Sequence, residues 1–477
     1  MSLRELLNKN KIFYLILLII VVIGAGLRFI NIQYSSLWAD ELYSMLSVHP
    51  DNSWYEILYM QRTYQPPGYF MLLWVWTKVF AYNDFYARLL SVLAGVATIP
   101  LAAYLGYLFR GRKLAIFMAF MTAFNPALIW NSLEARFYIF TFLLATLSLV
   151  LYAFNLLQGK RSWFFYLFKS GVDAALVYFH HFGILLLTGQ FIYDLVLLKR
   201  DKDSRLFVSK LLSYMLAALF YLPWVFFGLL EGLSIKQYWL KEIDVYAYVT
   251  YSFGYNIWLN SVAILLAFFC VYNQVRQKKT EWILFTAVIA IVLLTPLVYS
   301  YIRIPLLVDR YSIVMGPVLY LMTGYGVIDI VNNKYLYNKA LLIKLVFATS
   351  LVIYSASGLY MSLVDKSRLV KQPWREMAAW LKKRKDYQQI PVFAQGKQLK
   401  DKFTIDYYLE QPKKAQHFNT LHIGAEPIFY LVETNSVWKI KDSSMAKIHQ
   451  LYNVETFDFQ ENSVDFGRVY FCKLKEH

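Results

Sequence analysis

The chain has 477 residues, of which 58% are hydrophobic, 18% are aromatic and only 17% are charged. This composition is too apolar for a soluble globular protein and is typical of a polytopic membrane protein. The net charge of +17 does not indicate a nucleic-acid partner, because the Lys and Arg residues cluster in short segments between apolar stretches. We interpret these basic clusters as signals of membrane orientation and expect no nucleic-acid binding.

About eleven apolar segments of roughly 17 to 28 residues are long enough to cross the hydrocarbon core of a bilayer. The first is interpreted as a retained helix, because no convincing small-residue cleavage site of a signal peptide follows it. With the N-terminus in the cytoplasm, every basic cluster falls on the cytoplasmic side, which predicts that orientation. The predicted spans lie near 12–30, 86–109, 114–131, 137–157, 163–179, 182–198, 206–229, 246–272, 281–300, 311–331 and 342–361.

Two features within this pattern carry specific expectations. The long outer loop 31–85 contains Pro66-Pro67-Gly68 followed by about ten apolar residues, which predicts an interfacial helix rather than a full span. Lys169 and Asp173 lie four residues apart inside a predicted span, so we expect them to form an ion pair on one helix face.

After residue 361 the composition changes to that of a soluble domain. A helix is predicted from Pro373, and short apolar runs at 390–394, 427–432 and 469–472 predict strands. The predicted fold class is therefore an α-helical polytopic membrane protein, with a transmembrane domain at 1–361 and a soluble extracytoplasmic α/β domain at 362–477. The two cysteines, Cys270 and Cys472, belong to different regions, which argues against a disulfide framework.

Two adjacent carboxylates, Asp40 and Glu41, follow the first predicted span. Charge at a membrane surface is costly and is usually retained for a task. On a helix the two side chains diverge by about 100°, so one could act as a general base while the other fixes structure or a metal ion. The alternative is an ordinary helix start, where acidic side chains are favourable.

Glu134, Arg136 and Tyr138 lie in the turn between two predicted spans, on the same outer side as Asp40. A guanidinium group there could bind a phosphate through two hydrogen bonds. A simple ion pair between Glu134 and Arg136 is the alternative.

Further polar groups are predicted at the same outer side. His180 and His181 could form hydrogen bonds or contribute to a divalent metal site, although two consecutive histidines rarely chelate one ion. Arg303 and Arg310 would need an anionic partner at that depth, either Asp309 or a lipid phosphate. The loop with Lys236, Tyr238 and Trp239 could contact a lipid phosphate or a sugar, or form an ordinary aromatic belt.

Several short motifs occur in an order that resembles polytopic GT-C glycosyltransferases, in the dolichyl-phosphate-mannose protein mannosyltransferase and aminoarabinose transferase-like group. The resemblance covers roughly residues 10 to 360. The motifs are Trp38-x-Asp40-Glu41, Pro66-Pro67, Arg88-Leu-Leu-Ser-Val-Leu-Ala-Gly95, Glu134-Ala-Arg136-Phe-Tyr138, Tyr178-Phe-His180-His181-Phe-Gly183 and Asp309-Arg310-Tyr311 followed by Pro317.

The resemblance implies an enzyme of the bacterial inner or plasma membrane that transfers a monosaccharide from a polyprenyl-phosphate-linked donor to a hydroxyl of a glycan, glycolipid or protein. It implies an outward-facing site, inversion at the anomeric carbon, and Asp40 as the general base with Glu41 in support. A cofactor is not required by this reading, and a divalent metal ion stays open. The residues assigned to the donor phosphate and sugar are Glu134, Arg136, Tyr138, His180, His181, Arg303, Asp309, Arg310 and Tyr311, and those assigned to the acceptor or lipid loop are Gln65, Lys236, Tyr238 and Trp239.

The chain departs from the aminoarabinose transferase pattern at two positions. Gln65 stands where a Lys is typical, and Tyr138 stands where an Asp is typical, so aminoarabinose is not assigned as the donor sugar. A lipid-linked glycan flippase and a lipid-linked oligosaccharide ligase or polymerase are the alternative functions. A flippase is less favoured because transporters tend to bind at the membrane midplane and often contain inverted repeats. A membrane-anchored adhesion or sensor module would need only one helix.

Overall fold

The computed structural model describes residues 3–62, 65–159, 162–232, 243–332, 341–364, 372–384, 386–394, 398–399, 402–410, 414–434, 440–459 and 467–475. The chain divides into two compact units. Unit 1 comprises Met1–Ile30, Ser53–Leu72 and Leu89–Val364, and unit 2 comprises Asn31–Asn52, Leu73–Arg88 and Asp365–His477. Two parts of the long first loop therefore pack with the C-terminal segment.

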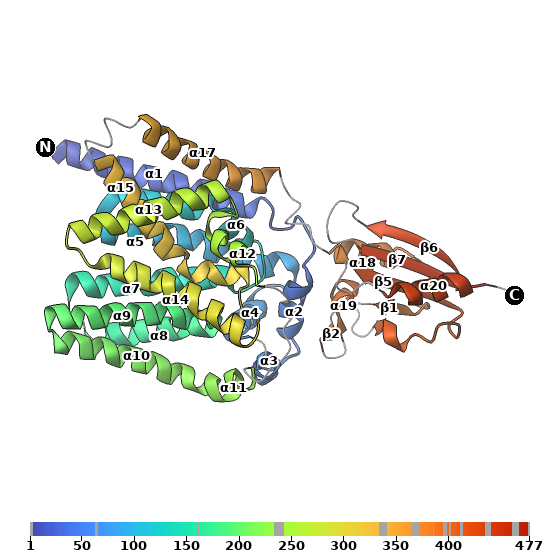
Figure 1. Cartoon of the computed structure of the whole chain (residues 1–477). Helices are drawn as coiled ribbons and strands as arrows, with labels where there is room; N and C mark the ends of the chain where they lie inside the picture. The colour runs from blue at the N-terminus through green and yellow to red at the C-terminus, as the bar shows by residue number, and fades with distance from the viewer. Residues whose placement is uncertain are drawn as a thin grey trace. The chain divides into compact units, whose positions relative to one another are not determined.

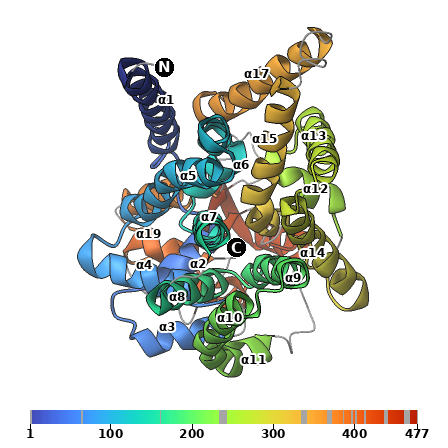
Figure 2. The same cartoon turned by 90° about the vertical axis from the view of Figure 1, so that its left-hand side faces the viewer.

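Unit 1 is a bundle of long helices whose axes run roughly along one direction (Figure 1). Seen along these axes, α7 lies in the middle of the bundle (Figure 2), and it contacts α6, α8, α9 and α15. The helices of this unit are α1 (Leu3–Phe29), α3 (Trp54–Gln61), most of α5 (Asp84–Phe124), α6 (Pro126–Ser132), α7 (Tyr138–Gln158), α8 (Trp163–Phe179), α9 (Gly183–Asp201), α10 (Ser204–Trp224), α11 (Leu230–Gly232), α12 (Val245–Thr250), α13 (Ile257–Arg276), α14 (Glu281–Ile302), α15 (Gly316–Asn332) and α17 (Leu341–Leu363), with short helical turns η1 (Val225–Leu229), η2 (Tyr251–Phe253) and η3 (Asp309–Met315).

Glycine, proline and asparagine set the helix ends inside the apolar stretches. The break that was predicted after residue 109 is present within α5, where Gly111 has a φ of 70°. The predicted span 114–131 is interrupted, because Asn125 caps α6 and Pro126 occupies its first turn. The predicted span 246–272 is also interrupted, because Gly254 has a φ of 71° and Asn256 starts α13 by accepting a hydrogen bond from Leu259 N.

Seven helical segments within the described parts of the chain are long and apolar enough to cross a membrane. The predicted interfacial segment forms α4 (Gly68–Val79), whose twelve residues are too few to cross a bilayer. The chain is therefore an integral membrane protein, and the total of eleven spans stays a prediction. The seven segments are Lys11–Phe29, Asp84–Phe124, Tyr138–Leu157, Ser204–Gly232, Ile257–Arg276, Glu281–Ile302 and Asp309–Asn332.

Unit 2 is built around a mixed five-stranded sheet with the order β4-β1-β5-β7-β6. Strands β4, β1 and β5 are parallel, whereas β5, β7 and β6 are antiparallel. The three predicted strands are confirmed as β1, β5 and β7, and the predicted helix as α18. The elements are α2 (Ala39–Ser47), α18 (Trp374–Lys382), β1 (Val392–Ala394), a hairpin of β2 (Gln398–Leu399) and β3 (Lys402–Phe403), α19 (Thr404–Leu409), β4 (Ala415–His417), a turn η4 (Phe418–Thr420), β5 (Ile428–Thr434), α20 (Asp442–Leu451), β6 (Tyr452–Phe459) and β7 (Gly467–Leu474).

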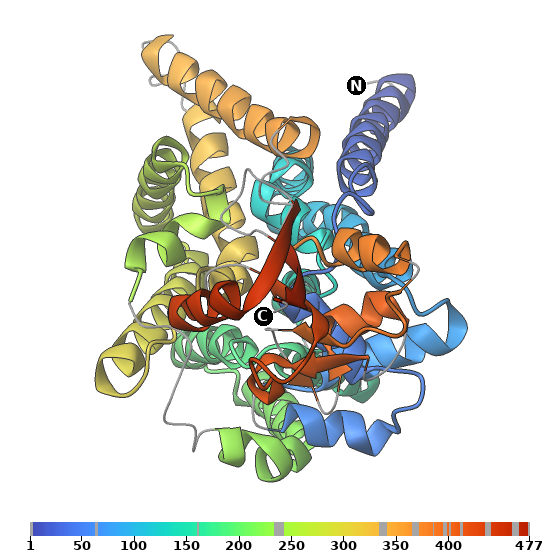
Figure 3. The ribbon, with the colours of Figure 1, turned by 90° about the vertical axis from the view of Figure 1, so that its right-hand side faces the viewer.

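The alternation of side chains along β5 gives the sheet two buried faces. Phe429 and Leu431 belong to a core cluster that includes Ile448 of α20, and Figure 3 shows α20 beside these strands. Tyr430 points the other way and meets Trp380 of α18, with 6.1 Å between the ring centroids. Helices therefore cover both faces, which explains why β5 is apolar from Ile428 to Val432.

Candidate active site

Glu41 is bound to Arg88 by a buried ion pair within unit 2. Arg88 Nε donates to Glu41 Oε1 (3.0 Å) and Arg88 Nη2 donates to Oε2 (2.8 Å). The side chains are 1% and 4% exposed, and Arg88 also donates to the carbonyls of Ile32, Ser35 and Ser36. Separating the two side chains would leave a buried charge without its partner, which is strongly unfavourable. The pair therefore holds the start of α2 against the first turn of α5.

The segment before α2 is also anchored by the C-terminal part of the chain. Ser36 Oγ donates to the Gln372 carbonyl (2.6 Å), and Ala39 N donates to Gln372 Oε1 (3.1 Å). Leu37 N donates to Tyr408 Oη (2.6 Å). Residues 36–41 are thus held from two directions.

Asp40 occupies the first turn of α2 next to this anchored glutamate. It is partly exposed, whereas Glu41 is buried. The N-terminal end of a helix favours a carboxylate electrostatically. The two adjacent acids therefore stand in different surroundings: Glu41 is buried against an arginine, and Asp40 is partly exposed.

In unit 1, the turn between α6 and α7 buries Glu134, Arg136 and Tyr138, each less than 5% exposed. Arg136 Nη2 donates to Gln65 Oε1 (3.2 Å), and its guanidinium carbon lies 4.9 Å from the Phe137 ring centroid. Gln65 and Arg136, which the sequence placed in separate loops, are therefore direct neighbours.

The Tyr138 ring is the meeting point of four predicted site residues, which we call the Tyr138 cluster. The guanidinium carbons of Arg310 and Arg136 lie 5.2 Å and 6.0 Å from its centroid. The rings of His180 and Tyr311 lie at 6.3 Å and 6.4 Å. Segments around residues 136, 180 and 310 thus bring two cations, an imidazole and two phenols together.

The two histidines are held as neutral rings. His180 Nδ1 accepts a hydrogen bond from Phe182 N (3.1 Å), and His181 Nδ1 lies 2.8 Å from Tyr221 Oη. Burial lowers the pKa of His180 to about 3, helped by His181 and by the positive charge of Arg136, and burial lowers the pKa of His181 to about 4. Within the described ranges, no group of three or more His, Cys, Asp and Glu residues is arranged to hold a metal ion.

Asp309 lies directly before Arg310 and accepts hydrogen bonds from Tyr255 Oη and from Arg310 N. Tyr255 was not expected at the site, and its φ of 61° gives no signal in the sequence. Arg303 is exposed at the end of α14. Lys236, Tyr238 and Trp239 lie outside the described residues.

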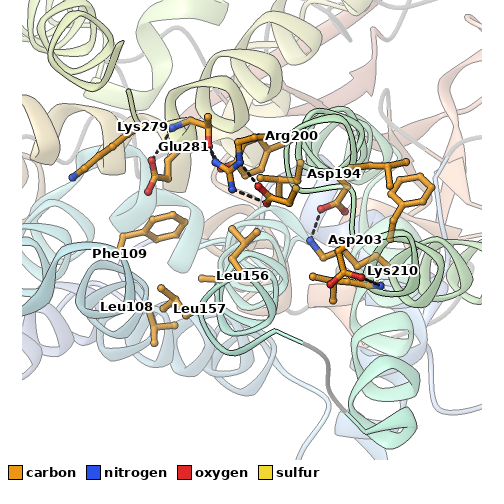
Figure 4. A pocket seen from close by; sticks show the side chains of 18 of the residues that line it. Leu108, Phe109, Leu156, Leu157, Asp194, Arg200, Asp203, Lys210, Lys279 and Glu281 are labelled. Carbon is orange, nitrogen blue, oxygen red and sulfur yellow. Dashed lines mark hydrogen bonds and ion pairs between the residues drawn. The ribbon is translucent and has the colours of Figure 1, made fainter. Parts of the chain in front are cut away.

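A second buried polar region lies nearer the other ends of α8, α9 and α10. The predicted ion pair between Lys169 and Asp173 is confirmed. A neighbouring pair joins Lys210 Nζ to Asp194 Oδ1 (2.6 Å), and Tyr152 Oη also donates to this oxygen (2.6 Å). Figure 4 shows Lys210 and Asp194 at the edge of a pocket of about 390 Å³. We call Lys169, Asp173, Asp194 and Lys210 the ion-pair region.

No protein-family model and no curated protein sequence matches the chain. Among solved structures, it is similar to ArnT from Cupriavidus metallidurans in the apo state, with a TM-score of 0.60, 14% identity and coverage of 98% of both chains. It is also similar to ArnT bound to undecaprenyl phosphate, with a TM-score of 0.58, 13% identity and coverage of 97% of this chain and 98% of that one.

A third similar structure is the oligosaccharyltransferase AglB from Archaeoglobus fulgidus in complex with an inhibitory peptide and a dolichol-phosphate. Its TM-score is 0.55 at 12% identity, and the match covers 96% of this chain and 74% of AglB. The likeness covers nearly the whole chain, so the expected combination of apolar helices with a C-terminal α/β part is confirmed. The chain therefore has the fold of the polytopic GT-C membrane glycosyltransferases.

Proposed function

We propose that this protein is a membrane glycosyltransferase that moves a monosaccharide from a polyprenyl-phosphate carrier to an acceptor hydroxyl, with inversion of the anomeric carbon. The observation that carries the proposal is the meeting of Arg136 and Arg310 at one buried tyrosine ring. Its setting is a fold shared with a protein that was solved with undecaprenyl phosphate. A polyprenyl phosphate is the anion that two guanidinium groups in a membrane protein would suit.

In the proposed reaction, the acceptor oxygen attacks the anomeric carbon and its proton passes to Asp40. The bond between the anomeric carbon and the phosphate oxygen breaks, and the electron pair stays on the phosphate. Arg136 and Arg310 stabilise the charge that develops on this leaving group. Glu41 is assigned a positioning role, because its carboxylate is bound to Arg88.

The neutral histidines fit this scheme as well. An uncharged imidazole leaves the phosphate site with its two guanidinium groups as cations. Because His180 Nδ1 accepts from Phe182 N, the neutral ring carries its proton on Nε2 and can donate one hydrogen bond to the sugar. We propose His180 and Tyr311 as contacts of the donor and place the catalytic domain within residues 1–361. The outward orientation of the site and an extracytoplasmic location of residues 362–477 are part of the same proposal.

The test compares purified wild type with Asp40→Asn in nanodiscs, supplied with radiolabelled polyprenyl-phosphate sugars and with extracted envelope glycolipids, glycans and proteins. We expect transfer to fall by at least about 10²-fold while the variant stays folded and still binds the donor. Asp51→Asn is the matched control, because Asp51 is an exposed carboxylate of the same unit. Unchanged transfer in Asp40→Asn would remove the assigned base.

A second candidate is the transfer of a whole oligosaccharide from a lipid carrier, which the likeness to AglB supports. The mass of the transferred group separates the two reactions. A gain of one sugar residue on the acceptor supports the monosaccharide reaction, and a gain of several in a single turnover supports the second candidate.

A further inference from the structure

Unit 2 contains a pocket of about 820 Å³. Its walls include the end of α2, residues 82–85 at the start of α5, and the helices α18 and α19. These helices are labelled in Figure 1. The volume lies within the range of roughly 300–1,000 Å³ that is common for small-ligand sites. None of the residues assigned above to the general base or to the donor lines it.

The pocket lining includes aromatic side chains that are held in place by contacts with one another. Tyr82 and Tyr407 meet edge to face with 5.5 Å between ring centroids, and Tyr407 meets Tyr408 at 4.9 Å. Tyr82 Oη donates to the Met45 carbonyl (2.7 Å), and Phe85 also lines the pocket. Rings with fixed orientations offer flat apolar surfaces, against which the C–H faces of sugar rings pack at a small entropic cost.

The pocket lining also carries groups that bind hydroxyls. Asp84 Oδ2 accepts hydrogen bonds from Arg375 Nη2 (2.5 Å) and Tyr408 Oη (2.8 Å), which fixes all three side chains. Lys382 and Glu410 form a partly exposed ion pair (3.1 Å) at the pocket. Both donors and acceptors are thus present, as hydroxyl groups require.

The combination of aromatic, acidic and basic side chains in the pocket favours a glycan over other classes of ligand. An acyl chain would need a continuous apolar wall, which the lining carboxylates and cations interrupt. A polyanion would need an excess of cations, whereas Asp84, Asp406 and Glu410 stand against Arg375 and Lys382. Aromatic faces beside planar polar groups suit a neutral or mildly charged carbohydrate.

The pocket also shares a residue with the anchor of the proposed base. Tyr408 lines the pocket and accepts the hydrogen bond of Leu37 N, three residues before Asp40. We propose that this pocket binds a glycan portion of the acceptor and so contributes to acceptor selection. The naming of the glycan as the acceptor rests on the proposed function, whereas the binding of a glycan rests on the pocket alone.

Photo-crosslinking tests the binding without any assumption about the reaction. Ala379→p-benzoylphenylalanine places the probe on an exposed, pocket-lining residue of α18, and Ala446→p-benzoylphenylalanine places it on an exposed residue of α20 outside the pocket. After irradiation of full-length protein in its native membranes, we expect sugar residues by mass spectrometry at position 379 and not at 446. A crosslinked peptide or sugar-free lipid at 379, equal crosslinking at both positions, or no crosslinked sugar would overturn the proposal.

Steady-state kinetics tests the link to the acceptor. We expect Tyr407→Ala to raise KM for the acceptor about tenfold, with kcat and the KM for the donor unchanged. Tyr407→Phe should retain most of the affinity, and Phe459→Ala on β6 is the aromatic control. An unchanged acceptor KM in Tyr407→Ala, in an active enzyme, would overturn acceptor selection. No transfer by the wild type would instead count against the proposed function, and the crosslinking result would still decide whether the pocket binds a glycan.

Discussion

The Tyr138 cluster and the ion-pair region both bury charge in the helices of unit 1, but they do so in different ways. In the ion-pair region, each ammonium group lies against a carboxylate on the same or a neighbouring helix. In the Tyr138 cluster, Arg136 and Arg310 both lie against aromatic faces of the same ring. Opposite charges in direct contact secure helix packing, whereas under the proposed function the two guanidinium groups around one ring stabilise the charge of a phosphate.

The largest effect is expected from breaking a buried pair. Asp173→Leu leaves Lys169 as a buried ammonium and should lower the free energy of unfolding by about 3–5 kcal/mol. The double variant Lys169→Met/Asp173→Leu removes both charges and should recover most of this loss. Thermal unfolding in detergent measures both variants. A double variant that is no more stable than Asp173→Leu would show that the pair does not act as a unit.

Changes in the Tyr138 cluster should act on transfer rather than on folding. We expect Arg136→Lys and Arg310→Lys each to lower kcat for transfer by about 10²-fold, because an ammonium group cannot reproduce the two parallel hydrogen bonds of a guanidinium. Arg303→Lys is the matched control and should change kcat by less than about threefold, since Arg303 is exposed. If Arg303→Lys had the largest effect, the phosphate site would have to be placed at the end of α14.

The pH dependence of stability should distinguish the Tyr138 cluster, which contains His180, from the ion-pair region. The pKa of buried His180 is about 3 in the folded protein, so the folded state does not bind the proton that the unfolded chain takes up below pH 6.5. Stability is therefore full above pH 6.5 and falls as the pH falls toward 3, by about 2 kcal/mol at pH 5.

His180→Gln removes this titration. The difference in unfolding temperature between pH 7 and pH 5 should become smaller in the variant than in the wild type. Equal differences in the two proteins would contradict the assignment of the titration to His180.

The smallest effect is expected at a partly exposed ion pair of the same unit. Arg62 Nε lies 3.0 Å from Glu231 Oε2, and both side chains are about one-third exposed. Solvent screens this pair, so Arg62→Met should lower the free energy of unfolding by less than about 1 kcal/mol. A loss as large as that in Asp173→Leu would mean that burial does not set the value of an ion pair in this protein.

The features that the sequence predicted well are local ones. The pairing of Lys169 with Asp173 follows from a spacing of four residues, and the strands β1, β5 and β7 follow from short apolar runs between polar turns. The interruptions at Asn125 and Gly254 were missed because the apolar composition continues through them. There, the capping side chain and the backbone angle decide the structure, and the hydropathy does not.

The contacts that define the site could not be predicted from the sequence, for a different reason. Glu41 and Arg88 are 47 residues apart, and Ser36 and Gln372 are 336 apart, so no periodicity connects them. The sequence contained one signal for the partner of Glu41. Arg88 lies at the start of a predicted span, where a charged side chain needs a partner. The gathering of side chains around Tyr138 depends on helix packing that a single sequence does not encode locally.

The anchoring of residues 36–39 by Gln372 and Tyr408 has a consequence for biosynthesis. A ribosome that adds about 5–20 residues per second needs roughly 20 to 70 seconds to translate the chain from Ser36 to Tyr408. During this interval the helices of unit 1 can enter the membrane, but the start of α2 lacks its final supports. A nascent chain that is released early therefore contains Asp40 without the contacts that hold residues 36–39. Under the proposed function, transfer activity then requires translation of the last quarter of the chain.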